Sequence, residues 1–266
     1  MSGNLSLERG LAVLEILAEA SEALGVREIA RRLGLSAAAT QRILNTLAER
    51  EYVRQETGSR RYVIGCAVLV LAKRLARHDG LVSAAEPELR ALAELDCFNG
   101  FLGVRRKDKG IYLLTVQSSG PVVIRSSPGE AFSLHATALG KALLMGLDAD
   151  ALTVTLGEEP YARLTPRTVT DRKTLLSHLK ASEAVGYTTS LDENFEGLIS
   201  VGAPVRDSTG AIRAAISIAY PRSVGPRVEI AQAGESIMAA AERISHALGF
   251  RSSKIKQIED ADHAAE

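Results

Sequence analysis

Residues 26–50, VREIARRLGLSAAATQRILNTLAER, decide the fold of the first part of the chain. Apolar residues at helical spacing predict a helix from Val26 to Leu33, and Gly34 can adopt the left-handed conformation that ends a helix. Ser36 is a candidate N-cap for another helix, which runs to about Arg50. The stretch therefore predicts two helices joined by a tight turn.

The sequence on either side of this stretch completes a known motif. Before it, four leucines at helical spacing predict an amphipathic helix that Ser6 would cap: Leu7, Leu11, Leu14 and Leu17. After it, β-patterned runs at 52–55 and 61–64 flank a turn that contains Gly58, which predicts a hairpin. This order of elements is that of a winged helix-turn-helix.

The polar face of the helix from Ser36 to Arg50 has the side chains that read base edges. Arginine suits guanine in the major groove, whereas asparagine and glutamine suit adenine. Short residues at the start of such a helix allow close approach to DNA, and hairpin arginines would lie over the backbone or minor groove. For Thr40, burial and a phosphate contact are both open. The predicted DNA-binding residues are Ser36, Ala38, Thr40, Gln41, Arg42, Asn45, Arg54, Arg60 and Arg61.

Charge supports this interpretation locally, although the whole chain has 32 basic and 32 acidic residues. Residues 26–77 contain eleven Lys or Arg and four Glu, a net charge of +7. Contacts with DNA phosphates need such an excess, whereas a polar helix face that is only solvated does not.

Composition limits the class of protein. With 266 residues, 46% hydrophobic and 24% charged, the chain has the composition of a soluble globular protein of one or two domains. Two cysteines, Cys66 and Cys97, are too few for a disulfide framework or a four-thiolate zinc site, and we expect both to be buried. Apolar runs are far shorter than the ~20 residues that span a bilayer. We expect a cytoplasmic protein that does not bind a membrane.

The rest of the chain predicts an α+β fold with helices packed on a sheet. A linker helix is expected at 66–77. Further helices are expected at 87–95, 138–147, 171–185 and 227–248, with strands at 98–105, 110–117, 122–126, 198–205 and 212–219. The predicted domains are residues 1–66, a linker at 67–80, a second domain at 81–251 and a flexible tail at 252–266.

Motifs along the chain, in their order and spacing, resemble those of the IclR family of bacterial transcriptional regulators. The likeness covers roughly residues 5–250. The motifs are Ile29-Ala-x-x-Leu33-Gly34-Leu35-Ser36, Ala39-Thr40-x-Arg42-x-Leu44-x-x-Leu47, Tyr52-Val53, Leu134-His135-Ala136-Thr137-Ala138-Leu139-Gly140-Lys141-Ala142, Gly186-Tyr187, Asp192-Glu193-Asn194-Phe195-x-Gly197 and Val201-Gly-Ala-Pro204-Val205.

The resemblance implies a GAF-like α/β effector-binding domain with an antiparallel sheet, joined by a linker helix to the winged helix. It also implies a homodimer or a dimer of dimers, with the linker helix near the dimer interface. Its pocket for a small organic effector would be formed by Ala136, Thr137, Asp192, Ser200, Ser217 and Ala219.

The loop 134–141 has two interpretations from its residues alone. Short residues that lead into a helix leave backbone N–H groups at its positive end, which favours an anion such as a carboxylate. Alternatively, they simply allow close packing of a helix on a sheet. A phosphate loop is excluded because Ala142 stands where such a motif needs a hydroxyl. His135 has no readable catalytic or metal-binding partner, and adjacent Asp192 and Glu193 would project to different sides.

These observations predict a sequence-specific DNA-binding transcriptional regulator, not an enzyme, with no cofactor and no metal. A dimer would read a pseudo-palindromic operator, and a small organic acid would modulate binding. The alternative is a small-molecule enzyme or sensor whose winged helix contacts protein. A regulator with a vestigial ligand domain is the third possibility.

Overall fold

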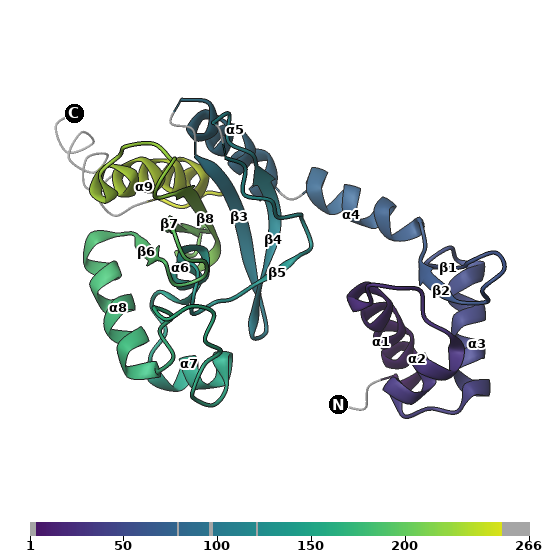
Figure 1. Cartoon of the computed structure of the whole chain (residues 1–266). Coiled ribbons are helices and arrows are strands. Elements are labelled where there is room, and N and C mark those ends of the chain that lie inside the picture. Colours follow the sequence, from purple (N-terminus) through teal and green to yellow (C-terminus); the bar gives the residue numbers. More distant parts are fainter. Residues whose placement is uncertain (1–3, 79, 96–97, 121, 252–266) are drawn as a thin grey trace, which may run out of the picture. The chain divides into compact units, whose positions relative to one another are not determined.

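The computed structural model describes residues 4–78, 80–95, 98–120 and 122–251 (Figure 1). The chain divides into two compact units, residues 1–78 and 79–266. The predicted tail at 252–266 and Cys97 lie outside the described residues. None of the helices in the described ranges is both long and apolar enough to cross a bilayer.

The first unit is the predicted winged helix-turn-helix. Gly34 is left-handed at φ 65° and ends the second helix, and the Ser36 side chain accepts a hydrogen bond from the Ala39 amide at 3.2 Å. Val53 pairs with Ile64 in an antiparallel hairpin. The elements are α1 (Leu5–Glu19), α2 (Val26–Leu33), α3 (Ala37–Glu49), β1 (Val53–Gln55), β2 (Tyr62–Ile64) and α4 (Ala67–His78).

The buried side of α1 matches the predicted stripe only toward the end of the helix, where Leu17 is buried and Leu14 packs against the core. Val13 and Leu17 are buried, whereas Leu7 and Leu11 are 62% and 53% exposed. The cap prediction is also wrong, because the Asn4 side chain, and not that of Ser6, accepts hydrogen bonds from the first amides of α1. Since α1 is apolar on more than one side, spacing alone could not show which row faces the core.

The second unit is built on one six-stranded sheet with the order β5-β4-β3-β8-β7-β6. Every neighbouring pair is antiparallel, as predicted. The elements in chain order are α5 (Gly80–Leu95), β3 (Asn99–Arg106), β4 (Lys109–Val116), β5 (Ala131–Phe132), α6 (Ala138–Leu144), α7 (Ala149–Leu156), α8 (Arg172–Val185), β6 (Thr188–Leu191), β7 (Leu198–Arg206), β8 (Ile212–Pro221) and α9 (Ile230–Ala247).

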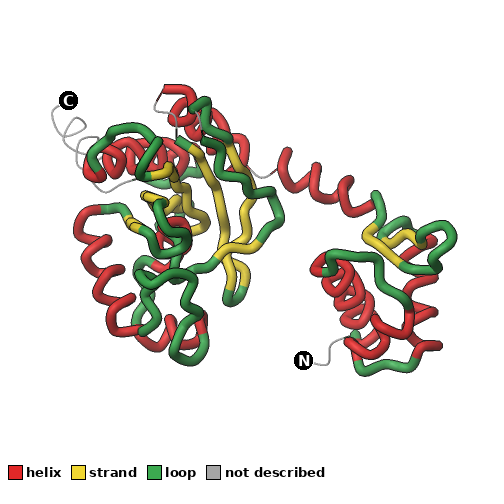
Figure 2. Tube along the Cα trace, in the orientation of Figure 1, coloured by secondary structure: helices red, strands yellow, loops and turns green. Residues whose placement is uncertain are grey.

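Helices cover both faces of this sheet, so that the second unit has three layers (Figures 1 and 2). Strand residues such as Val201 and Ile218 pack with α5 and α9 in one core. Phe101 and Ala219 pack on the other face with α6, α7 and α8 in a second core. The alternation of side chains along each strand produces these two cores.

Several predicted elements need correction. Residues 122–126 form no strand, because the Asn99 side chain hydrogen-bonds to their backbone. It accepts from the Ile124 amide at 3.0 Å and donates to the Val122 carbonyl at 3.3 Å. The helix at 138–147 ends at Leu144, and the helix predicted to begin at Pro87 begins at Gly80. The short elements β5, β6 and α7 were not predicted.

The two units divide after His78, so that α4 groups with the first unit. The predicted boundaries at residues 66, 80 and 251 stay predictions. The burial expected for Cys66 is wrong, because this residue is exposed at the start of α4.

Candidate functional site

The structure orients α3 with its polar face outward. Leu44 is completely buried on the inner side, against β1 and the other helices of the first unit. The predicted DNA-binding residues of this element that are exposed are Ser36, Ala38, Arg42 and Asn45.

Thr40 is the exception among the predicted residues of α3. It is fully buried, and its hydroxyl donates to the Ser36 carbonyl at 3.1 Å. The helix backbone therefore satisfies the only polar group of this side chain, and its methyl group can pack in the core. The prediction that Thr40 contacts DNA is corrected in favour of burial.

The wing places its arginines on the surface. Arg54 and Arg60 are exposed, and Arg60 is left-handed at φ 53° in the turn that contains Gly58. Arg61 is also exposed, but its guanidinium donates to the Ala23 carbonyl at 3.1 Å. The structure thus separates two outward arginines from a third that is tied to the loop before α2.

Gln41 is half-buried where α3 meets the wing. Its Nε2 donates to Asn45 Oδ1 at 2.7 Å and to the Tyr62 hydroxyl at 3.0 Å. Tyr62 could not be singled out from the sequence, because this contact joins residues 21 positions apart in the chain. The signal available was a tyrosine in a strand beside a helix with two amide side chains.

The second unit has a cavity of about 750 Å³ on the face of the sheet that α6, α7 and α8 cover. Four of the six predicted effector residues line it: Thr137, Ser200, Ser217 and Ala219. Across the described part of the chain, the hydroxyls of Ser200 and Ser217 have no hydrogen-bond partner from the protein. The cavity therefore offers two unengaged hydroxyls beside apolar surface.

Aromatic residues missed by the sequence analysis form much of the lining. The rings of Tyr112 and Phe132 are tilted against each other with centroids 4.6 Å apart, and the Phe101 ring lies 5.5 Å from that of Tyr112. Tyr161 packs on His135 at 5.2 Å. Ring pairs at these separations form a rigid apolar wall.

Two predicted effector residues, Ala136 and Asp192, do not line the cavity. Ala136 is fully buried, and its carbonyl accepts from the Ser190 hydroxyl at 2.7 Å. Asp192 is left-handed at φ 63°, and its carboxylate accepts from Arg222 at 2.7 Å, with Arg167 at 3.4 Å. Their role in binding an effector stays a prediction, and in this structure the Ala136 carbonyl and the Asp192 carboxylate bond to other side chains.

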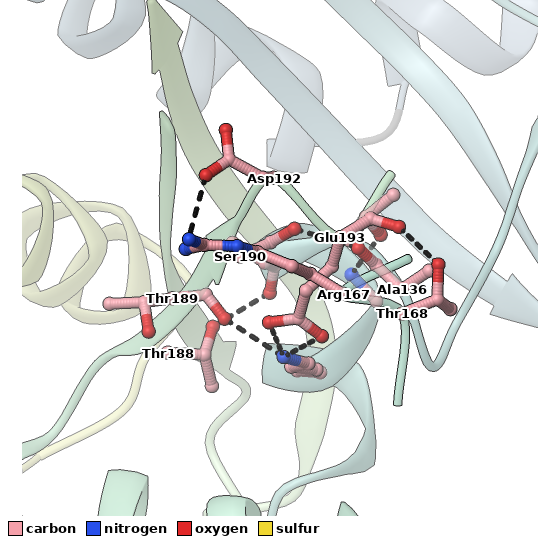
Figure 3. Close-up of polar contacts among 12 residues, drawn as sticks. Ala136, Arg167, Thr168, Thr188, Thr189, Ser190, Asp192 and Glu193 are labelled. Atoms are coloured by element: carbon pink, nitrogen blue, oxygen red, sulfur yellow. Dashed lines mark hydrogen bonds and ion pairs between the residues drawn. The ribbon is translucent and has the colours of Figure 1, made fainter. Parts of the chain in front are cut away.

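Glu193 turns the opposite way from Asp192, as predicted (Figure 3). Its carboxylate accepts from Lys141 Nζ at 2.6 and 2.7 Å, and Lys141 also donates to the Thr189 carbonyl at 3.0 Å. The two side chains are only 3% and 9% exposed. Burial lowers the pKa of Lys141, and the charge of Glu193 opposes this effect. The pair fastens α6 to the loop after β6.

His135 lines the cavity with both ring nitrogens engaged. Nε2 lies 2.9 Å from the Ala162 carbonyl, and Nδ1 lies 3.1 Å from Ser133 Oγ. Since a carbonyl only accepts, the proton of the neutral ring is on Nε2, and Nδ1 accepts from the serine. Burial is the main cause that lowers the pKa of His135. The ring thereby orients its loop.

The start of α6 shows that its small residues permit close packing. A Cβ atom on Gly202 of β7 would lie 2.8 Å from the Ala138 carbonyl, and one on Gly140 would overlap the backbone of Leu134. Thr137 caps the helix by accepting from the Gly140 amide at 2.9 Å. The close-packing interpretation is confirmed, whereas anion binding at this loop stays a prediction.

The ranges that the structure describes contain no group of three His, Cys, Asp or Glu residues placed to hold a metal ion. Two candidate sites follow from the contacts above. One is the exposed face of α3 with the wing, and the other is the cavity of the second unit.

Comparisons with known proteins match both units. The family model described as IclR helix-turn-helix domain matches residues 6–57, and that described as bacterial transcriptional regulator IclR C-terminal matches residues 73–246. The HTH-type transcriptional repressor AllR of Escherichia coli (strain K12) is 28% identical over 249 residues, which are 94% of this chain and 92% of that protein.

Solved structures share the fold. A crystal structure of an IclR transcriptional regulator from Alicyclobacillus acidocaldarius aligns with a TM-score of 0.82 at 26% identity, over 93% of this chain and 100% of that chain. An IclR homolog from Microbacterium hydrocarbonoxydans, crystallised with 4-hydroxybenzoate, aligns with a TM-score of 0.73 at 21% identity, over 91% of this chain and 98% of that chain.

Proposed function

Because the chain belongs to the IclR family of bacterial transcriptional regulators, we propose that its first unit binds a specific operator and that a small organic acid in the second unit modulates this binding. The observation that carries the proposal is the exposed polar face of α3, which contains Arg42 and Asn45, together with the exposed arginines of the wing. In the cytoplasm, where a bacterial chromosome lies, this face would enter the major groove.

Individual residues have separate roles in this proposal. Arg42 would read guanine, and Asn45 would read an adjacent base edge. Ser36 and Ala38 at the start of α3 would allow the backbone close to DNA, while Arg54 and Arg60 would neutralise phosphates. Arg61 would act partly through the loop that it holds.

The cavity supports a small organic ligand. Its volume of about 750 Å³ is in the range of small-molecule pockets, which combine apolar walls with a few polar groups. The hydroxyls of Ser200 and Ser217 can donate to a carboxylate, and the rings of Phe101 and Tyr112 can pack on its apolar body. The homolog crystallised with 4-hydroxybenzoate, a small aromatic acid, has the same fold.

Two helices support the proposed assembly as a dimer or a dimer of dimers. Exposed apolar side chains favour association when a second copy of the chain can cover them. One set lies on α1 and one on α4, with exposed fractions of 53% to 72%: Leu5, Leu7, Leu11, Leu69, Val70 and Leu71. A dimer would place two recognition helices on the half-sites of a pseudo-palindrome.

Operator binding can be tested with duplexes selected by the full-length protein from a random-sequence library. We expect R42A to weaken binding to the selected duplex by about 5- to 150-fold, since one base contact contributes ~1–3 kcal/mol. Binding of unrelated duplex should change much less. R213A, which removes an exposed arginine of the second unit, is the control. Equal binding of the selected duplex by R42A and the unsubstituted protein would contradict the proposal.

A further inference from the structure

The amide nitrogen of Gln41 is fully used within the first unit. Its two hydrogens go to Asn45 Oδ1 at 2.7 Å and to the Tyr62 hydroxyl at 3.0 Å. An amide has two donor hydrogens and one acceptor oxygen, so only Gln41 Oε1 is left for another partner. Gln41 in this arrangement cannot make the two-bond contact with adenine that a free glutamine makes.

Tyr62 is held rigidly on both sides. Its side chain is only 3% exposed, and its strand pairs with β1 through Gln55. On the other side its amide donates to the Leu24 carbonyl at 2.8 Å, and its carbonyl accepts from the Leu24 amide at 3.1 Å. The hydroxyl is therefore a fixed acceptor beside the amide of Gln41.

We propose that Tyr62, which lies behind the reading face, is a specificity-determining positioning residue: its hydroxyl fixes Gln41, and Gln41 fixes Asn45. The inference rests on the proposed binding of an operator by α3. With the amide of Gln41 held, the helix presents a defined pair of groups outward. Gln41 Oε1 is an acceptor, and Asn45 Nδ2, whose oxygen is engaged by Gln41, is a donor.

This pair selects bases by their major-groove edges. An acceptor at Gln41 requires a base with an exocyclic amine there, which is adenine or cytosine, and excludes guanine and thymine. A donor at Asn45 requires an acceptor such as a purine N7. Adenine offers the N6 amine beside N7, so one adenine can satisfy both side chains. The structure thus assigns an amine-bearing base to the position opposite Gln41.

Removal of the Tyr62 hydroxyl should relax this selection. In Y62F the ring stays in the core, but Gln41 Nε2 loses one acceptor and its amide can rotate. A rotated amide presents donors, which guanine and thymine accept. We expect the preference for adenine or cytosine over guanine or thymine at one base pair per half-site to fall by about three- to tenfold, the effect of one hydrogen bond.

The experiment is selection of duplexes from a random library by the full-length protein, its Y62F and Q41A variants and the Y62F/Q41A double variant. Affinities are then measured for the four bases at the relaxed position and for an unrelated duplex. Y52F is the matched control, because the Tyr52 hydroxyl makes no hydrogen bond with another described residue. Thermal unfolding of each variant reports folding.

The base profile separates positioning from a general structural role. We expect Y62F to lose discrimination at one position while affinity for the unrelated duplex and the salt dependence stay unchanged. In the Q41A background, Y62F should have no further effect on the profile. A Y62F profile identical to that of the unsubstituted protein, or an equal loss on every duplex, would overturn the inference.

The selection also tests the proposed function separately. If the unsubstituted protein enriches no motif, operator binding fails, and the inference fails with it. If it enriches a motif that Y62F and Q41A leave intact, operator binding stands and only the role of Tyr62 is refuted.

Discussion

His135 shows how burial and hydrogen bonding set the state of a single residue. The neutral ring donates from Nε2 to Ala162 and accepts at Nδ1 from Ser133. A proton on Nδ1 would remove the acceptor and place a charge in a buried site near the Lys141 ammonium. Burial, and to a smaller extent the charge of Lys141, lower the pKa of His135 below its ordinary value of 6.5. The hydrogen bond to the Ala162 carbonyl acts in the opposite direction and raises this pKa.

A pH dependence of stability follows from this shift. Below about pH 6.5, unfolded chains take up a proton that the folded second unit resists, so the free energy of unfolding falls as pH falls toward the folded pKa. We expect H135Q to flatten this part of the curve, measured by denaturant unfolding between pH 5 and 8. H178Q, which replaces an exposed histidine of α8, should keep the slope of the unsubstituted protein. The same slope in H135Q would refute this assignment.

The residues that sequence predicted well are those whose partners are local. Ser36 and Gly34 follow from cap chemistry within one turn of helix, and the structure confirms both. The contacts of Ala136 with Ser190 and of Asp192 with Arg222 could not be predicted, because the fold brings these distant residues together. Similarly, the contact between Tyr62 and Gln41 depends on the packing of the wing against α3.

Among the elements, α6 is the one on which the cavity depends. Gly202 allows it to lie against β7, and the Thr188 hydroxyl donates to the Ala138 carbonyl at 2.7 Å. The Lys141 ammonium then joins α6 to Glu193 in the loop that also supplies Asn194 and Phe195 to the cavity lining. This loop and α6 are therefore coupled through one buried ion pair.

Breaking this pair from one side should be costly. We expect K141M to lower the free energy of unfolding of the second unit by about 3–5 kcal/mol, because Glu193 would be left buried without its partner. Replacing Glu193 as well, in K141M/E193Q, should recover part of the loss. Denaturant unfolding measures both, with K180M on the exposed side of α8 as the control. A loss under about 1 kcal/mol in K141M would contradict this role.

Elements with strong periodicity were predicted from sequence, whereas short ones were not. The long strands β7 and β8 have clear alternation and appear where predicted. The run at 122–126 begins with three β-branched residues, which favour a strand, but the Asn99 side chain bonds to two of its backbone groups. The buried positions of β6 are Thr188 and Ser190, whose hydroxyls donate to backbone carbonyls at the start of α6. Because these residues are polar, the strand lacks the alternating apolar pattern that would have predicted it.

For the whole molecule, two units serve one function: the first presents a polar helix face, and the second contains a ligand cavity. A ligand changes operator affinity only if it binds the DNA-competent arrangement of the chain with a different affinity from the other arrangement. Such couplings are typically about 1–3 kcal/mol, or roughly 5- to 150-fold in affinity. A regulator with a vestigial cavity would show no coupling.

The most direct test of this regulator's function is the affinity of the full-length protein for its selected duplex, with and without a panel of small acids that includes pyruvate, benzoate and 4-hydroxybenzoate. We expect at least one acid to change the affinity by about fivefold or more. This change should vanish in S217L, which replaces a lining hydroxyl with a bulky apolar side chain, and persist in S177L on the exposed side of α8. An acid effect that S217L retains, or no effect from any acid, would contradict effector control through this cavity.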